Sequence, residues 1–114
     1  MDTDLIMVCG TVNSRPVINK DPQNKSVCNF ELAVFKGKPD GTVSEKIFTI
    51  CAWNKLGENM WGHLCEGDEV AIVGECFADG YLDKDNQPRA RLRINAKQAV
   101  YSPEAIARFA NAQR

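Results

Sequence analysis

The stretch that most constrains the fold is residues 47–74, IFTICAWNKLGENMWGHLCEGDEVAIVG, which reads as a strand, a short helix and a strand. Residues 47–53 mix β-branched, aromatic and small side chains that suit a half-buried strand, and residues 69–74 return to that pattern. Between them, apolar residues recur at helical spacing: Leu56, Met60 and Leu64. A helix this short, with Gly57 and Gly62 inside it, is not stable alone. It must pack against a sheet that the rest of the chain supplies.

Three residues predict where this helix begins and ends. Asn54 precedes the helical spacing and is a preferred N-cap residue. Glu58 lies in the predicted first turn, where the helix dipole favours an anion. Gly67 can adopt the left-handed conformation that ends many helices. We therefore expect a helix that is capped by Asn54 and ends near Gly67.

The rest of the chain contains further strand patterns. Together with the two strands above, the predicted strands are residues 5–12, 27–36, 47–53, 69–77 and 89–101. Gly10 inside the first strand indicates a bend or bulge. The alternation is clearest in the fifth strand, where arginines alternate with small and aliphatic residues.

The connecting segments are rich in proline, glycine and aspartate, which favour turns. Residues 13–26 are predicted as a loop or a short irregular hairpin, and residues 36–45 and 79–88 as loops or turns. Ser102 as cap, with Pro103 and Glu104 after it, predicts a short C-terminal helix.

Five strands with one short helix between the third and the fourth predict an all-β domain, a five-stranded OB-fold barrel of Greek-key type. The predicted domain covers residues 1–101, and residues 102–114 form a C-terminal helical extension. The strand 2–3 face and the neighbouring loops of this fold bind oligonucleotides.

The composition fits one ordinary globular domain. The chain has 114 residues, of which 44% are hydrophobic and 25% charged. It has no run of about 18 apolar residues, so no membrane span is expected. The acidic start MDTDLIMVCG is not a secretory signal. The net charge of -1 shows no basic excess of the kind that nucleic-acid binders carry, so such a function must depend on where the charges lie.

The cysteines and the short motifs argue against a metal site and an enzyme. The five cysteines form no CxxC pair, and their odd number disfavours a disulfide framework. We interpret them as buried thiols in a reducing compartment, the cytoplasm. An organelle, phage or plasmid origin stays open. The sequence contains no nucleophile elbow, phosphate-binding loop or HExxH motif. We therefore expect no catalytic residues, metal or cofactor.

Three aromatic residues are candidates for base stacking. Trp53 is in phase with Thr49 and Cys51 and out of phase with the predicted core residue Ile50, so its ring should face outward. Tyr81 lies in a polar turn, and Phe35 lies on the predicted outward face of the second strand. Each has an alternative: Trp53 under the helix or in a subunit interface, Tyr81 folded back on the barrel, and Phe35 in an interface.

The basic residues predict phosphate contacts. A stripe on the fifth strand is joined by lysines in flanking elements; the set is Arg89, Arg91, Arg93, Lys36, Lys38, Lys46, Lys55 and Lys84. Such residues can neutralise phosphates and release counterions. The alternative is a solvated strand face whose charges are paired with surface acids. Trp61 and His63 on the helix are predicted to pack in the core or an interface.

Six segments of the chain together resemble the pattern of a known family. The segments LIMVCGTV, RPV, SVCNFELAVFK, FTICAWNKLGE, EGDEVAIVGE and YLDKDNQPR occur in that order. Together they resemble the OB-fold domain of bacterial and mitochondrial single-stranded-DNA-binding proteins. The resemblance covers residues 4–100, and the AWNKLGE element followed by a helix and an EGDxVxxxG strand is its most specific part.

The resemblance implies binding of single-stranded DNA without sequence preference, by base stacking plus phosphate contacts. RNA is a second candidate ligand. It also implies a homo-oligomer, a dimer or a tetramer, with roles in replication, recombination and repair and contacts to proteins of those processes. The residues predicted to be covered by subunits are Leu5, Met7, Cys9, Trp61 and His63.

The chain departs from the family pattern in its aromatic residues and its end. Trp53 and Tyr81 match two stacking positions of the family. Ile47 occupies a third, which is often tryptophan, and Lys38 lies near a fourth, so two of the four rings are absent. Phe35 can partly compensate. The flexible tail with an acidic tip, which bacterial members use to recruit enzymes, does not follow Arg114. We expect either the core of a longer protein or a short-chain variety.

The near-zero charge and the absent rings also motivate an alternative function. In this alternative the chain is an OB-fold protein–protein module of the replication-restart or primosome accessory type, with weak nucleic-acid binding.

Overall fold

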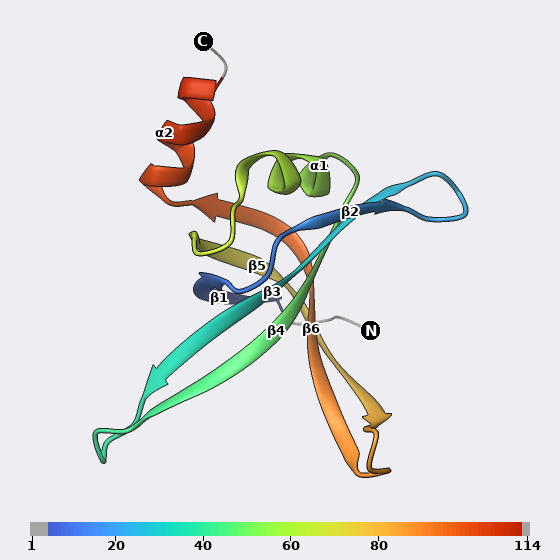
Figure 1. Cartoon of the computed structure of the whole chain (residues 1–114), viewed down its shortest axis with the longest axis vertical. Coiled ribbons are helices and arrows are strands. Elements are labelled where there is room, and N and C mark those ends of the chain that lie inside the picture. Colours follow the sequence, from blue (N-terminus) through green and yellow to red (C-terminus); the bar gives the residue numbers. More distant parts are fainter. Residues whose placement is uncertain (1–4, 113–114) are drawn as a thin grey trace.

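The computed structural model describes residues 5–112 and contains six strands and two short helices (Figure 1). The elements are β1 (Leu5–Val12), β2 (Val17–Lys20), β3 (Ser26–Gly37), β4 (Val43–Trp53), α1 (Asn54–His63), β5 (Glu69–Leu82), β6 (Pro88–Tyr101) and α2 (Pro103–Ala112). No helix within residues 5–112 is long and apolar enough to cross a membrane.

Five of the strands form a closed barrel. The sheet order is β1-β5-β6-β4-β3-β2, and an additional pairing of β1 with β3 closes the ring. Among the described strands, β4 and β6 alone pair in parallel; the other pairings are antiparallel. The chain between these two parallel strands includes α1, which lies across one end of the barrel (Figure 1). The prediction of a five-stranded OB-fold barrel is confirmed.

β2 adds a sixth strand outside the ring. It pairs with the start of β3, from Val17 opposite Asn29 to Lys20 opposite Ser26. Asp21 closes the turn, because its Oδ1 accepts hydrogen bonds from the backbone N–H groups of Gln23 and Lys25. Of the two predictions for residues 13–26, the short hairpin is therefore correct.

The core follows the predicted side-chain alternation. On β3 and β4 six inward residues are buried to at least 93%: Cys28, Phe30, Leu32, Phe48, Ile50 and Ala52. The alternation ends at Ala33, which is buried on the opposite face, while the inward Val34 is half-buried. α1 closes the end of the barrel with Met60, which is fully buried, and Leu64, which is 5% exposed. Burial of such side chains, at roughly 1.5–3 kcal/mol each, holds this short helix in place.

Two glycines let backbones approach closely at the ends of the barrel. A Cβ on Gly10 would lie 2.4 Å from the carbonyl oxygen of Ala33, where β1 crosses to pair with β3. A Cβ on Gly57 would lie 2.2 Å from the carbonyl oxygen of Ala52, under α1. Gly10 thus lies where the barrel closes, at the close approach of β1 to β3.

The predicted helix ends require correction. Asn54 provides no side-chain cap; it is the first helical residue, has a φ of 57°, and the N-cap position falls on Trp53. Asparagine tolerates this left-handed backbone better than most residues do. Glu58 lies beyond the first turn, and its carboxylate accepts a hydrogen bond from Ser26 Oγ at 3.2 Å.

The helix α1 also ends earlier than predicted, at His63. Gly67 does take a positive φ, of 94°, but in the turn after the helix, where its N–H donates to the carbonyl oxygen of Val12. The cap of the second helix is as predicted, because the Ser102 hydroxyl accepts a hydrogen bond from the N–H of Ala105.

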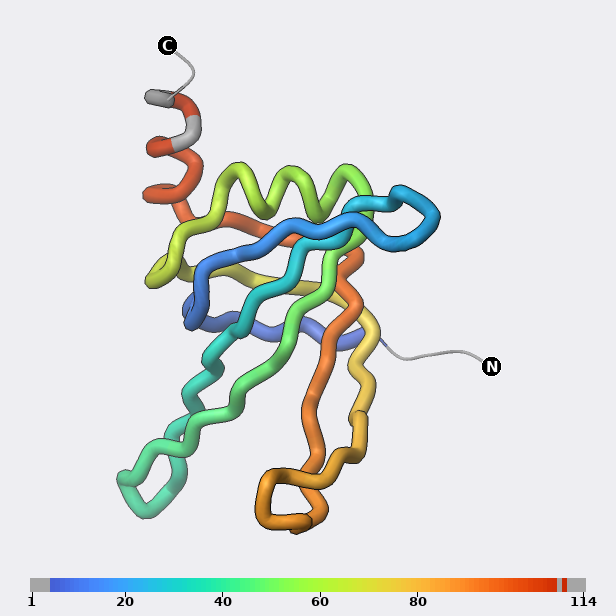
Figure 2. Tube along the Cα trace, turned by 45° about the vertical axis from the view of Figure 1, so that its right-hand side comes forward, coloured from blue at the N-terminus to red at the C-terminus, as the bar shows by residue number. Residues whose placement is uncertain are grey.

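Two long hairpins, β3–β4 and β5–β6, extend from the barrel as separate arms (Figures 1 and 2). β4 and β6 are paired only from Phe48–Leu92 to Cys51–Asn95, and before that point the two strands separate. β5 and β6, by contrast, stay paired up to Leu82 and Pro88. Tyr81 therefore lies within a strand, where the sequence had predicted a turn.

Candidate nucleic-acid interface

The separation of β4 from β6 creates a cavity between the arms, which we call the fork cavity. Its volume is about 420 Å³. Its lining residues come from β3, β4, β5 and β6 and are Glu31, Lys46, Ile47, Thr49, Tyr81, Ala90, Arg91 and Leu92. The cavity thus combines an aromatic ring, aliphatic side chains and two cationic groups, which suits a nucleotide.

The outward face of the β5–β6 arm carries the predicted basic stripe. Alternation on β5 places Phe77, Asp79 and Tyr81 on this face, and the strand register places them opposite Arg93, Arg91 and Arg89. We call these six residues the arm row. Its aromatic members are both partly exposed, Phe77 at 42% and Tyr81 at 44%.

Each arginine of the arm row contacts a side chain two residues beyond the one opposite it, in β5 or in the turn that follows. Arg93 Nη2 is 2.9 Å from Asp79 Oδ2, and Arg89 Nε is 2.9 Å from Asp83 Oδ2. Arg91 lies over the Tyr81 ring, with its Cζ 5.0 Å from the centroid. The stripe was predicted to contact either phosphates or surface acids. In this structure two of its three arginines are paired with acids.

Trp53 ends β4 with its ring facing outward. It is 40% exposed, whereas its neighbour Ala52 and Ile50 are fully buried. Cys51 and Thr49 precede it on the same face, and Thr49 pairs with Arg93 across the parallel ladder. Trp53 therefore faces outward, as the alternation along its strand predicted. One continuous outward surface links Trp53 to the arm row.

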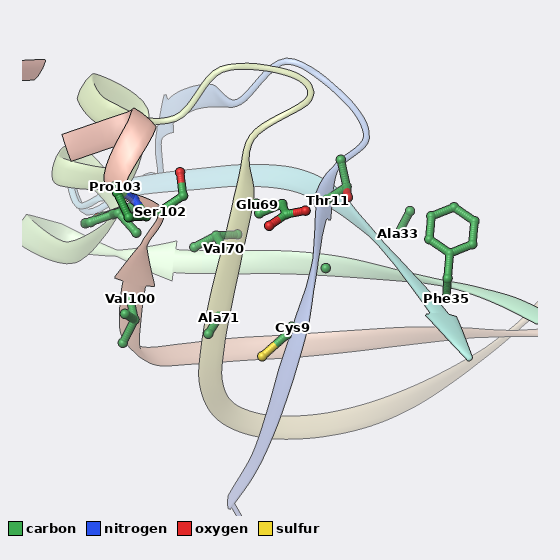
Figure 3. Close-up of a pocket in the computed structure, with 12 residues that line it drawn as sticks. Cys9, Thr11, Ala33, Phe35, Glu69, Val70, Ala71, Val100, Ser102 and Pro103 are labelled. Atoms are coloured by element: carbon green, nitrogen blue, oxygen red, sulfur yellow. The ribbon is translucent and has the colours of Figure 1, made fainter. Parts of the chain in front are cut away.

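Phe35 lies apart from the other aromatic candidates. It is 59% exposed and lines a second cavity, of about 450 Å³, together with residues of β1, β5 and β6. Figure 3 shows it at the edge of this cavity, beside Ala33 and away from Val100. The structure does not bring Phe35 to the fork cavity, and its position fits the interface alternative better than the stacking one.

The predicted lysines are distributed over four places. Lys46 lines the fork cavity. Lys36 and Lys38 lie exposed towards the tip of the β3–β4 arm, Lys84 is in the turn of the β5–β6 arm, and Lys55 follows Trp53 in α1. All five are exposed, so they can reach phosphates without desolvation of a buried charge.

Sequence reasoning missed two residues of this surface. Phe77 was placed at the end of a strand, although its alternation with Cys76 and Ala78 already assigns it to the face of Tyr81. Asn95 lies between Cys51 and Glu75 in the ladder, and its buried Oδ1 has no hydrogen-bond partner among the described residues. No sequence signal could have found this orphan acceptor, because it depends on packing.

Local electrostatics fix the turn of the β5–β6 arm. The pKa of Asp83 is lowered by the N–H of Gln87, by Arg89 and by the N–H of Asp85. Burial raises the pKa of the Cys51 thiol, an effect that Arg93 partly opposes.

Among residues 5–112 no cluster of three or more His, Cys, Asp or Glu side chains is arranged to hold a metal.

Comparison with known proteins agrees with this geometry. The model of the single-strand binding protein family matches residues 4–101. A single-stranded DNA-binding protein of Deinococcus radiodurans is 35% identical over 109 residues, which cover 92% of this chain and 35% of that protein. The chain thus spans about a third of the length of this relative.

A solved structure shows the same fold. The small single-stranded DNA-binding protein from Streptomyces coelicolor superimposes with a TM-score of 0.74, at 24% identity, over 91% of this chain and 98% of that one. At this identity the likeness concerns the architecture alone.

Proposed function

Because the chain belongs to the single-strand binding protein family, we propose that it binds single-stranded DNA without sequence preference and so protects and organises it in replication, recombination or repair. The observation that carries this proposal is the continuous outward surface from Trp53 to the arm row. It offers exposed rings for base faces and cationic side chains for phosphates, the two features that a single strand presents.

The ligand path that we propose starts at Trp53, passes Thr49 and the fork cavity, and follows the arm row. Trp53, Phe77 and Tyr81 act as stacking platforms, each worth about 1–3 kcal/mol per base. Lys46, Lys55, Lys84 and the three arginines contact phosphates along the way, and Lys36 and Lys38 reach the strand from the other arm.

The test is a fluorescence titration with oligo-dT at several salt concentrations. In a Trp61→Phe variant all indole emission comes from Trp53, so stacking should quench it. The apparent affinity should fall as salt increases, because each neutralised phosphate releases counterions. Unchanged emission at low salt, with no binding by an independent filter assay, would contradict the proposal.

We further propose that the protein is a homo-oligomer whose contact includes the outer face of β1. Leu5, Met7 and Val100 are 58%, 67% and 66% exposed. The register places Met7 beside Val73, and Cys9 beside Ala71, which faces Val100. Exposed apolar side chains that gather in this way are typical of subunit interfaces. A Met7→Glu variant should dissociate in sedimentation experiments, and a wild-type chain that is monomeric at micromolar concentration would exclude the contact.

The prediction that the five cysteines are buried is wrong for Cys9 and Cys65, which are exposed; only Cys28 is buried. All five are free thiols, which supports a reducing location, and we place the protein in the cytoplasm with the nucleoid. Immunolocalisation with a DNA stain tests this assignment.

A further inference from the structure

The carboxylates of the β5–β6 arm are placed where they compete with the proposed ligand. Asp79 and Asp83 hold the Arg93 and Arg89 side chains at 2.9 Å. These arginine side chains remain 44% and 61% exposed, so a phosphate can approach them from solvent. Arg91 forms no ion pair among the described residues and lies on Tyr81. At two of its three arginines, a phosphate that binds this row therefore competes with a carboxylate that is already paired with the guanidinium.

We propose that Asp79 and Asp83 are specificity-determining residues that favour single-stranded over double-stranded DNA. The inference depends on the proposed function, since it concerns the same surface. Repulsive groups that act against the wrong ligand are a common source of specificity. Here the carboxylates lower the affinity for any polyanion, and the exposed rings restore it only for a ligand with accessible base faces.

The two forms of DNA differ in what they offer to this surface. A duplex presents phosphates at high density but keeps its bases stacked inside. Its binding depends on free cationic groups, of which the paired arginines are poor examples. A single strand adds stacking on Tyr81, Phe77 and Trp53, at a strength that outweighs an exposed ion pair. The two carboxylates therefore weaken duplex binding more, because a duplex must engage the paired arginines, whereas a single strand that is held by the rings can place its phosphates on other cationic groups.

The two oxygens of Asp83 separate this role from the structure of the turn. Oδ1 accepts hydrogen bonds from the N–H groups of Asp85 and Gln87, and Oδ2 binds Arg89. An asparagine keeps an oxygen for the turn but loses the charge that competes with phosphate. Within residues 5–112 the Asp79 carboxylate accepts no hydrogen bond from a backbone N–H, so Asp79→Asn weakens only the pair with Arg93.

The experiment measures the affinity of wild type and the Asp79→Asn/Asp83→Asn double variant for oligo-dT and for a duplex of equal length at low salt. We expect about threefold tighter binding to oligo-dT and about tenfold tighter binding to the duplex. The slope of log affinity against log salt should steepen by up to about 0.7 per released arginine for oligo-dT and about 0.9 for the duplex.

The control variant is Asp85→Asn, which removes one carboxylate charge in the same arm, where the double variant removes two. The Asp85 carboxylate has no ion pair or hydrogen bond to any residue within 5–112. It should change both affinities less than the double variant and leave their ratio unaltered. If the wild type binds oligo-dT but the double variant has the same ratio of oligo-dT affinity to duplex affinity as the wild type, the inference is overturned. Loss of wild-type binding to oligo-dT would instead overturn the proposed function, and the inference with it.

Discussion

Arg91 lies over the ring of Tyr81, with the guanidinium carbon 5.0 Å from the ring centroid. The contact covers one face of the ring and orients it, and the ring is still 44% exposed. A base can therefore stack on the free part of a platform that is already held in position. Replacement of Tyr81 by alanine should weaken oligo-dT binding by about 1–3 kcal/mol.

The matched control for this prediction is Tyr81→Phe, which keeps the ring and removes the hydroxyl. It should bind as wild type does, as measured by fluorescence titration. Equal affinity of the alanine variant and wild type would remove Tyr81 from the interface.

Trp53 should contribute independently of Tyr81. Its ring is exposed at the opposite end of the proposed path, and its removal leaves the core of β4 intact, because Ala52 and Ile50 face inward. Trp53→Ala should weaken oligo-dT binding by about 1–3 kcal/mol with little change in the urea midpoint. Trp61→Ala, in which an equally large exposed ring is lost from α1, serves as the control. A larger effect on DNA affinity from Trp61 than from Trp53 would place the ligand elsewhere.

The barrel could be predicted because its signals are local. Alternation of side chains on β3 and β4 depends only on the period of a strand, and it assigned Phe48, Ile50 and Trp53 to the correct faces. The helix ends were less predictable. Asn54 adopts a left-handed backbone because β4 continues directly into α1, a consequence of packing that residue preferences do not contain.

The sequence predicted which side chains share the outward surface of the site, but not the contacts between those side chains. Parity identified the arginine stripe, and it could have identified Phe77. The ion pairs of Arg89 and Arg93 depend on the register of β5 against β6, which the turn between the strands sets for this arm; the register shift between Val73 and Gly74 lies beyond the arm row. A shift of one residue would have brought other side chains opposite the arginines. Sequence alone does not fix that offset.

Ile47 offers a test by gain of function. It lines the fork cavity with Tyr81 and is 36% exposed, so a larger side chain can extend outward without disturbing the core. Resemblance to the family makes tryptophan the natural replacement. Ile47→Trp should strengthen oligo-dT binding by about 1–3 kcal/mol. Ile47→Leu is the control for volume and apolarity, and it should leave the affinity unchanged. A weaker Ile47→Trp variant that remains folded would show that the strand does not enter the cavity.

The thiols should differ sharply in reactivity. Burial, and then the neighbouring Cys51, raise the pKa of the Cys28 thiol from 9.0 to about 11. Cys28 is also fully buried, whereas Cys65 is exposed. At pH 8 a maleimide should label Cys65 rapidly and Cys28 only when the protein unfolds, because the thiolate is the reactive species. Mass spectrometry of peptides distinguishes the two sites, and equal labelling rates would contradict the buried position.

The raised pKa of Cys28 also predicts how stability depends on pH. The unfolded thiol ionises near pH 9, while the folded thiol stays protonated up to about pH 11. The unfolded state therefore binds fewer protons between these values, and the free energy of unfolding should fall as pH rises from about 9 to 11. Below pH 9 this contribution is constant. Cys28→Ala should show a shallower decline across that window, and an identical decline would assign the effect to other groups.

Replacement by alanine should have opposite effects on the stability of the fold at two glycines of α1. At Gly57 a new Cβ would lie 2.2 Å from the carbonyl oxygen of Ala52 and 3.2 Å from the backbone nitrogen of Cys28. Neither atom can move without a shift of its strand. At Gly62 a Cβ meets nothing within 4 Å. Gly62→Ala should stabilise the fold by up to about 1 kcal/mol, since alanine favours a helix.

Gly57→Ala should instead destabilise the fold by about 1–3 kcal/mol, the usual cost of excess volume in a packed core, in spite of the same gain in helix propensity. Urea denaturation of both variants measures the difference, and each variant is the control for the other. If both were stabilised equally, α1 would have to lie farther from β4 than the contact with Ala52 requires. Because Trp53 connects β4 to α1, the Gly57→Ala variant should also lose affinity for oligo-dT, whereas Gly62→Ala should retain it.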